Sequence, residues 1–535
     1  MGSHGCALRD KLARLSALRV GHAHQSLRKI VLSSPSITAH ESKRIARNAV
    51  VLASASLISK GLLFIWQFVL ARWIGETAYG IYGTVGGLAV IASIIGSFSM
   101  GLIVIREVSR EPSKAGAYFA STLFLQTFLM GVAYIVLNGS AWALGYSETI
   151  RVFTALSGVA LLMDLFGNIC SDQLLAQEKM LSTALVDTLH IAFRIGATAW
   201  ALAQGYDLVG LYAVGIVASF ARSLVMGATL IRTGVHPRFP LERALTIQLL
   251  VNSLPLAVSA FFTLIYQQAD KLLSTRFLSE ATTGYLTAAY VIVQAIIELF
   301  STTVLVATYP MMSRTYGRGE LFGFVLEKLA FFTAVITLPV GLILGIFAPF
   351  VTLPLFGADF APTASILRIL VWYAVITMIV NVFAQGMLVQ NQQRRLLIIK
   401  VVGVLLNVGF NLLTVLWLSW GVYGLVIASV VAELLTLQVM FLTFREVGTN
   451  MLRLTRKLAL LAIVGLGVAG VMMGVGAVAS PLLAIMIGVG LYAVLMMRLP
   501  ILDAEEWDLL YRLLASIPIG KYILHIWHRQ VEVNW

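Results

Sequence analysis

The sequence has little charge and almost no cysteine. Only 12% of its 535 residues are Asp, Glu, Lys or Arg, about half the share of an average soluble domain, and 59% are hydrophobic. The two cysteines, Cys6 and Cys170, fall in segments that the expected topology keeps apart, so no disulfide framework is predicted. No residue spacing is typical of a metal site. A mean hydropathy of +0.89 indicates an integral membrane protein.

Long polar segments are also missing. No loop between the apolar runs exceeds about twenty residues, whereas the smallest domains need about 50. The sequence therefore leaves no room for a soluble catalytic domain between the spans. The absence of a phosphate-binding glycine loop argues against ATP hydrolysis by this chain. We expect no enzymatic activity and no cofactor.

Apolar runs of about 20 residues, the length that a helix needs to cross a bilayer, are abundant. The alternating pattern of barrel strands is absent, so helices are predicted to span the membrane. The predicted fold class is an all-α polytopic membrane protein with about 14 transmembrane helices. The expected spans are 48–71, 79–104, 116–137, 152–171, 181–202, 208–231, 246–269, 282–307, 325–348, 364–388, 396–418, 422–443, 458–478 and 481–498.

The basic residues responsible for the net charge of +13 lie mainly in the tails and in loops between the spans, so the charge does not indicate a nucleic-acid partner. Basic residues gather in alternate loops, whereas the opposite loops and helix ends carry only Arg72, Arg151, Lys271 and Arg276. By the positive-inside rule, the basic loops and both termini face the cytoplasm. Amphipathic tails are expected on that side over 1–45, which is basic, and over 501–535.

An internal repeat divides the chain into halves. The stretch "ARWIGETAYGIYG" at 71–83 aligns without gaps with 275–287. Later, "GLYAVGIVA" at 210–218 matches "GLVIASVVA" at 424–432. Six spans separate each matching pair, so the repeats are predicted to be parallel. The expected organisation is two six-helix lobes, 46–233 and 246–446, followed by two extra helices over 454–500.

The repeated stretch places matching charges at a predicted hairpin in each half. Arg72 and Arg276 end one helix, while Glu76 and Glu280 open the next, as the helix dipole favours. These four charges are therefore interpreted chiefly as hairpin anchors.

Ionisable side chains inside spans are costly and mark candidate functional sites. In the first lobe Lys60 lies mid-span with no acid nearby in sequence; it either lines a cavity or pairs with Asp164 or Asp187. Arg222 is a second candidate partner for these two acids. Asp187, His190 and Arg194 follow helical spacing, which predicts one shared face directed into the first lobe.

The second lobe carries its own ionisable and amide groups. Asp270 and Lys271 are adjacent on one helix and project about 100° apart, so one is predicted to brace its own lobe. Lys271 is the expected inward group. The predicted cavity cations and polar lining are Lys60, Arg194, Arg222, Lys271, Arg276, Asn381 and Gln385. The coupling or ion-pair candidates are Asp164, Asp187, His190, Asp270, Glu298 and Glu433.

The segments "DKLLSTRFLSEATTGYLTAAYVI" at 270–292, "YPMMSRTYGRGE" at 309–320 and "LARWIGETAYGIYG" at 70–83 carry a family resemblance. Over residues 43–450 the sequence resembles the polysaccharide biosynthesis and O-antigen flippase (Wzx-type) family. That family belongs to the superfamily of multidrug and toxin extrusion antiporters and lipid II flippases. Ser274 departs from the glycine that such proteins often have there.

The resemblance implies a flippase that moves undecaprenyl-diphosphate-linked oligosaccharide, an O-antigen or a capsule or exopolysaccharide repeat unit, by alternating access of two lobes. It implies a bacterial or archaeal cytoplasmic (inner) membrane, contact with membrane lipid, and a monomer. Other polysaccharide-assembly membrane proteins are candidate partners, and coupling to Na⁺ or H⁺ stays open. One alternative is a cation-coupled drug or metabolite antiporter. A second is a membrane-embedded polysaccharide polymerase or ligase, which the short loops disfavour.

Overall fold

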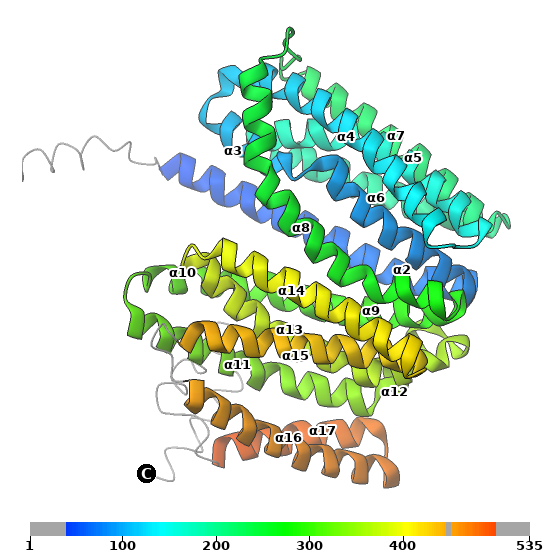
Figure 1. Ribbon diagram of the computed structural model, residues 1–535, viewed down its shortest axis with the longest axis vertical. Helices are drawn as coiled ribbons and strands as arrows, with labels where there is room; N and C mark the ends of the chain where they lie inside the picture. Colours follow the sequence, from blue (N-terminus) through cyan, green and yellow to red (C-terminus); the bar gives the residue numbers. More distant parts are fainter. Residues whose placement is uncertain (1–38, 446–450, 499–535) are drawn as a thin grey trace, which may run out of the picture. The chain divides into compact units, whose positions relative to one another are not determined.

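The computed structural model describes residues 39–445 and 451–498, and the regular secondary structure in these ranges is helical (Figure 1). By internal contacts the chain divides into residues 1–57 and 58–535. The described part of the first unit is the beginning of helix α2. The predicted amphipathic tails lie outside the described residues, except for 39–45, which belong to α2.

The α-helices are Ala39–Ser97 (α2), Met100–Arg110 (α3), Ala115–Ala143 (α4), Glu148–Ala176 (α5), Met180–Ala203 (α6), Asp207–Ile231 (α7), Arg243–Phe277 (α8), Glu280–Phe300 (α9), Val306–Arg314 (α10), Gly319–Ile346 (α11), Ala348–Phe356 (α12), Ala361–Val389 (α13), Gln393–Leu412 (α14), Gly421–Arg445 (α15), Met451–Val478 (α16) and Pro481–Arg498 (α17). Short turns are the 3₁₀ segments Pro112–Lys114 (η1) and Ala358–Phe360 (η3) and the π-helical segments Ser301–Leu305 (η2) and Leu413–Trp417 (η4).

Twelve helical segments among the described residues are long and apolar enough to cross a membrane, judged by length and composition. The sequence predicted fourteen spans, and that number is not reached. One reason is that Ser56–Arg110 counts as a single segment of 55 residues, although α2 breaks at Gly75 (φ 76°, ψ 173°). The second is that α6 is not among the twelve, because its ionisable side chains lower its hydropathy.

The helix boundaries repeat along the chain, as the sequence predicted. Helices α3 and α10 end at Arg110 and Arg314, and the long helices that follow, α4 and α11, begin at Ala115 and Gly319, which is the spacing of the repeated hairpin stretches. Helices α5 and α13 each have 29 residues, and α7 and α15 each have 25 residues. The number of residues between the members of these later pairs is slightly larger, which indicates small insertions in the second half. The helices thus repeat in the same order in the two halves, α2–α7 and α8–α15.

The two halves bend at the same point by different means. Between α2 and α3, Phe98 and Ser99 adopt left-handed conformations (φ 49° and 53°), which interrupt the helix. At the equivalent point of the second half, the wide π-helical turn η2 joins α9 to α10. A bend at this sequence position is therefore common to both halves, although the backbone produces it in two ways.

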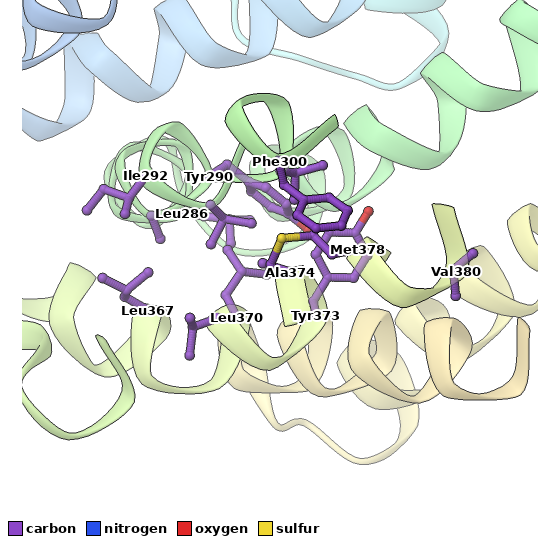
Figure 2. Close-up of a cluster of buried hydrophobic side chains, with 14 of the residues drawn as sticks. Leu286, Tyr290, Ile292, Phe300, Leu367, Leu370, Tyr373, Ala374, Met378 and Val380 are labelled. Atoms are coloured by element: carbon purple, nitrogen blue, oxygen red, sulfur yellow. The ribbon is translucent and has the colours of Figure 1, made fainter. Parts of the chain in front are cut away.

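Helix α13 lies at the centre of the second half and packs against α9, α11 and α15. Its buried side chains Leu367, Leu370 and Met378 meet Leu286 and Phe300 of α9 (Figure 2). In the first half α5 packs against α4 and α7, and α6 packs against α7 (Figure 1). The last two helices, α16 and α17, pack against each other and against α11. The core of each half thus fixes the helices that carry the polar groups described next.

Candidate functional site

An ion pair joins helices of the two halves. Lys60 Nζ of α2 lies 2.6 Å from Glu298 Oε1 of α9. Their side chains are 48% and 46% exposed, so neither is enclosed by protein. A half-exposed ion pair in the apolar part of two spans is costly in lipid, so these groups are favoured to contact water or a polar ligand.

Of the two alternatives for Lys60, a pair with Asp164 or Asp187 is not formed, and a cavity-lining role stays a prediction. The partner is Glu298, which lies 238 residues away on the other half. Asp164 and Asp187 instead form ion pairs with Arg222. Sequence spacing within one half could not indicate a partner on the other half.

Arg222 of α7 forms the centre of a polar cluster in the first half. Its Nε lies 2.8 Å from Asp187 Oδ1 of α6, and its Nη1 lies 3.6 Å from Asp164 Oδ1 of α5. Nη1 also donates to Asn168 Oδ1 at 2.9 Å. Only 11% of the Arg222 side chain is exposed, so the guanidinium ties three helices together. The hypothesis that Arg222 pairs with these acids is confirmed.

The other predicted residues of α6 separate from this cluster. The His190 ring Nδ1 lies 3.2 Å from the carbonyl oxygen of Ala218 on α7, which holds the imidazole against that helix. Arg194, one turn further, is exposed. Asp187 and His190 therefore both reach α7, whereas Arg194 does not share the enclosed position.

Asp270 of α8 is buried in the second half, with a residue exposure of 1%. Its carboxylate accepts hydrogen bonds from Ser429 Oγ at 2.6 Å, from Asn411 Nδ2 at 2.7 Å and from the Tyr290 hydroxyl. Asn407 extends the network by donating to Ser429 Oγ at 2.8 Å. Three donors from three helices satisfy one buried carboxylate, so Asp270 braces its own half, as the sequence predicted for one member of its pair.

Lys271 donates its hydrogen bond outside the Asp270 network, although it lies over the ring of Tyr290. Its Nζ donates to Gln268 Oε1 at 3.1 Å and lies 5.5 Å from the centre of the Tyr290 ring. The same Gln268 oxygen lies close to α2, since a Cβ placed on Gly87 would be 3.3 Å from it. Gln268 thus lies between the Lys271 ammonium group and helix α2 of the first half. Its part in substrate binding stays a prediction.

A cavity of about 100 Å³ adjoins Glu433 of α15. Tyr266 donates to Glu433 Oε2 at 2.5 Å, and Asn381 and Lys400 also line the space. Lys400 Nζ donates to Thr263 Oγ1 at 3.2 Å. Sequence reasoning missed Lys400, although the rule that singled out the other mid-span charges applies to it equally.

Gln385 has a structural contact that the sequence did not suggest. Its Nε2 donates at 2.7 Å to the carbonyl oxygen of Leu305, the last residue of the wide turn η2. A π-helical turn leaves backbone groups without their usual partners, and this amide satisfies one of them. Gln385 therefore supports the bend between α9 and α10, and its predicted place in a cavity lining stays a prediction.

The repeated hairpins meet where α2 and α9 cross. A Cβ on Gly80 would overlap the carbonyl oxygen of Glu280 and lie 2.8 Å from Gly284 N. A Cβ on Gly284 would overlap the carbonyl oxygen of Glu76 and lie 3.2 Å from Gly80 N. Residues that the repeat makes equivalent thus touch each other through bare backbone.

Both hairpin arginines reach the opposite half. Arg72 Nη2 donates to the carbonyl oxygen of Pro354 on α12, and the Arg276 guanidinium carbon lies 3.6 Å from a Cβ placed on Gly145. The predicted anchoring role therefore extends across the two halves. Arg276 is exposed and lies outside the polar groups around Lys60, so the structure does not bring it together with the other predicted cavity residues.

Two residues after α4 add hydrogen bonds between the first half and the hairpin of the second half. Tyr146 donates to the carbonyl oxygen of Leu272 at 3.0 Å, and burial raises the pKa of its phenol, which keeps the donor proton. Ser147 Oγ donates to Glu280 Oε1 at 2.7 Å. The segment after α4 thus donates two hydrogen bonds to the hairpin of the second half.

A family model described as "Polysaccharide biosynthesis protein" matches residues 45–316, just over half of the chain. The chain belongs to the polysaccharide biosynthesis protein family. Membership confirms the resemblance drawn from the hairpin segments. No curated protein matches the chain.

Solved structures share the fold of this family member at low sequence identity. The lipid II flippase MurJ in an inward closed conformation has a TM-score of 0.65 and 14% identity, covering 87% of this chain and 100% of its own. An inward-facing multidrug resistance MATE family transporter of the MOP superfamily has a TM-score of 0.62 and 18% identity, with 76% and 99% covered. A MOP superfamily transporter from Pyrococcus furiosus has a TM-score of 0.52 and 17% identity, with 76% and 96% covered. The chain therefore has a MATE- and MurJ-like transporter fold.

Proposed function

We propose that the protein is a flippase that moves undecaprenyl-diphosphate-linked oligosaccharide, an O-antigen, capsule or exopolysaccharide repeat unit, from the cytoplasmic to the external face of the membrane. The observation that supports the proposal is the half-exposed ion pair between Lys60 of the first half and Glu298 of the second. Family membership and the fold shared with a lipid II flippase support the same substrate class.

The substrate chemistry requires such a group. A diphosphate cannot enter an apolar layer without compensating charge, whereas a polyprenyl tail can stay in lipid beside the protein. Lys60 supplies a cation, and Glu298 neutralises that cation when no substrate is bound. The diphosphate would displace the Glu298 carboxylate from Lys60, so Glu298 acts as an exchangeable counter-ion.

The proposed displacement gives Glu298 a distinct signature. Removing its charge with Glu298→Gln would leave Lys60 unpaired and raise the affinity for a diphosphate. The same change would slow release, because the carboxylate would no longer compete for Lys60. Lys60→Ala would weaken binding and transport together.

The test is transport of fluorescent lipid-linked oligosaccharide in proteoliposomes that contain the full chain, with substrate binding measured in parallel. We expect Lys60→Ala to abolish transport, Lys60→Arg to retain part of it, and Glu298→Gln to bind tighter but transport more slowly. Arg232→Gln, which changes an exposed cation at the end of the first half, is the control. Full transport by Lys60→Ala, or export of cationic drugs in place of the oligosaccharide, would contradict the proposal.

Coupling to a cation gradient is part of the proposal and concerns Asp270. Its carboxylate is held by side chains from α9, α14 and α15, so a change in its protonation or ligation would be felt by three helices at once. Transport should then depend on an imposed Na⁺ or H⁺ gradient, measured in the same vesicles. Equal rates with and without either gradient would exclude such coupling.

A further inference from the structure

A cleft of about 510 Å³ lies between α10 and the start of α11, away from the Lys60–Glu298 pair. Its lining combines the apolar side chains of Pro310, Met311, Leu321 and Val325 with two cations, Arg314 and Arg318. Both arginines are exposed. Among the described residues, no acidic side chain forms an ion pair with either of them.

The internal repeat supplies a direct comparison for these two arginines. In the register that aligns α3 with α10, Arg110 corresponds to Arg314 and Lys114 to Arg318. In the first half Arg110 lies 3.7 Å from Glu107, and Lys114 lies 2.6 Å from Glu111. Glu107 also pairs with Arg106 at 2.8 Å. Both first-half cations that correspond to Arg314 and Arg318 therefore have a carboxylate within 4 Å.

The acids are replaced in the second half. The positions that correspond to Glu107 and Glu111 are Met311 and Thr315. Met311 adds apolar surface to the cleft, and Thr315 turns its hydroxyl to the carbonyl oxygen of Met312 at 2.7 Å. The two substitutions thus remove two negative charges and leave two guanidinium groups at the mouth of an apolar cleft.

The location of the cleft restricts its ligand. Arg314 ends α10, which follows the span Glu280–Leu305, and Arg318 precedes the span Gly319–Ile346, so we place both cations near the membrane surface. The positive-inside rule places this basic loop at the cytoplasmic leaflet, which is rich in anionic lipids. Guanidinium groups bind phosphate oxygens with two parallel hydrogen bonds, and an apolar floor accepts an acyl chain.

We propose that this cleft, which we name the Arg314–Arg318 cleft, binds the phosphate group of an anionic phospholipid of the cytoplasmic leaflet. Arg314 and Arg318 hold the phosphate, while Met311, Leu321 and Val325 contact the upper part of an acyl chain. The site is separate from the substrate cavity proposed above, so it does not depend on the identity of the transported glycan.

The experiment measures lipid binding to the purified full chain in detergent, using dioctanoyl phosphatidylglycerol and dioctanoyl phosphatidylcholine. We expect the wild type to bind phosphatidylglycerol, which is anionic, more tightly than phosphatidylcholine. Each arginine lost should weaken binding about 5-fold, and the double variant Arg314→Gln/Arg318→Gln about 30-fold. The matched control, Arg110→Gln/Lys114→Gln, removes the equivalent charges of the first half and should bind like the wild type.

A second variant keeps both arginines and therefore does not depend on the folding of the first. Met311→Glu/Thr315→Glu rebuilds the acids of the first half and should lose phosphatidylglycerol binding to the same degree. Equal loss in the control variant, equal affinity for the two lipids, or unchanged binding in the rebuilt variant would overturn the proposal. Tighter, arginine-dependent binding of a polyprenyl diphosphate would reassign the cleft to the transported lipid. Equal affinity for inorganic phosphate would exclude a lipid ligand.

Discussion

Gly80 and Gly284 touch backbone to backbone across the two halves of the protein. A Cβ on Gly80 would lie 2.8 Å from Gly284 N and overlap the Glu280 carbonyl oxygen, and the reciprocal substitution meets Glu76. Close approach of this kind requires glycine on both helices. Because the two residues are equivalent in the repeat, the contact is nearly self-complementary.

Gly80→Ala should therefore separate the hairpins. Thr84 Oγ1 and Thr275 Oγ1 lie 2.6 Å apart beside the crossing, so cysteines at these positions should form a disulfide readily in a background without Cys6 and Cys170. We expect Gly80→Ala to reduce this cross-linking several-fold, measured by gel shift after mild oxidation. Gly86→Ala is the control, since a Cβ there has no neighbour within 4 Å. Equal cross-linking in both variants would show that the crossing tolerates a methyl group.

The Arg222–Asp187 pair should contribute to stability in the first half. Removing Asp187 leaves the largely enclosed Arg222 with only the more distant Asp164, and removing Arg222 leaves both acids without their cation, so the two changes should not add. A double-mutant cycle of Arg222→Gln and Asp187→Asn should give a coupling free energy of about 1–3 kcal/mol in thermal or denaturant unfolding. Additive effects would mean that solvent or Asn168 replaces the lost partner.

Asp270→Asn should destabilise the second half. The carboxylate accepts three hydrogen bonds, but an amide has one acceptor oxygen and turns an NH₂ group toward donors. One buried donor without an acceptor costs about 1–3 kcal/mol, which should lower the thermal midpoint of the purified protein. The exposed Asp359→Asn substitution should leave the midpoint unchanged. A midpoint equal to that of the wild type would indicate that Asp270 is already protonated in the folded protein.

Lys271→Gln should reduce oligosaccharide transport far more than Arg276→Gln at equal expression. Lys271 is partly enclosed and contacts Gln268 beside α2, whereas Arg276 is an exposed cation at a helix end. A helix-end cation contributes only about 0.3–1 kcal/mol through the dipole, so its loss should be mild. Comparable transport losses would assign Lys271 to the hairpin contact alone.

The membrane orientation can be tested with residues outside the contacts described above. Glu320→Cys should react with an impermeant thiol reagent only from the cytoplasm, and Ser480→Cys only from outside, since the positive-inside rule places them so. Both side chains are exposed. The reverse labelling would move the Arg314–Arg318 cleft to the external leaflet and contradict its assignment to cytoplasmic phospholipid.

The repeat, the helices and the bracing role of one member of the Asp270–Lys271 pair could be predicted because they depend on local spacing. Apolar length sets a span, and the gapless alignment of the two hairpin stretches predicted that Gly80 and Gly284 are equivalent. Arg222 was paired with the right acids because all three residues lie within one half.

Contacts between halves could not be predicted in the same way. The Lys60–Glu298 distance depends on how α2 and α9 face each other, and no sequence period reports that angle. The amide of Gln385 has its partner at a wide turn that exists only once the second half has folded. Helix α6 was predicted as a span and is long enough to be one, yet its ionisable residues lower its hydropathy below that of the twelve apolar segments among the described residues.

The two halves bend at equivalent positions, but the backbone hydrogen bonding at the two bends differs. Left-handed residues at Phe98 and Ser99 end one helix and start another, so the hydrogen-bond ladder is interrupted there. The π-helical turn Ser301–Leu305 keeps the ladder continuous and widens it instead. A wide turn contains one extra residue, so movement of the turn past a residue would rotate that residue's side chain by about 100° around the helix. Glu298 lies three residues before Ser301, so movement of the turn past Glu298 would swing that carboxylate away from Lys60. Among the described residues, the first half has no wide turn at the equivalent position.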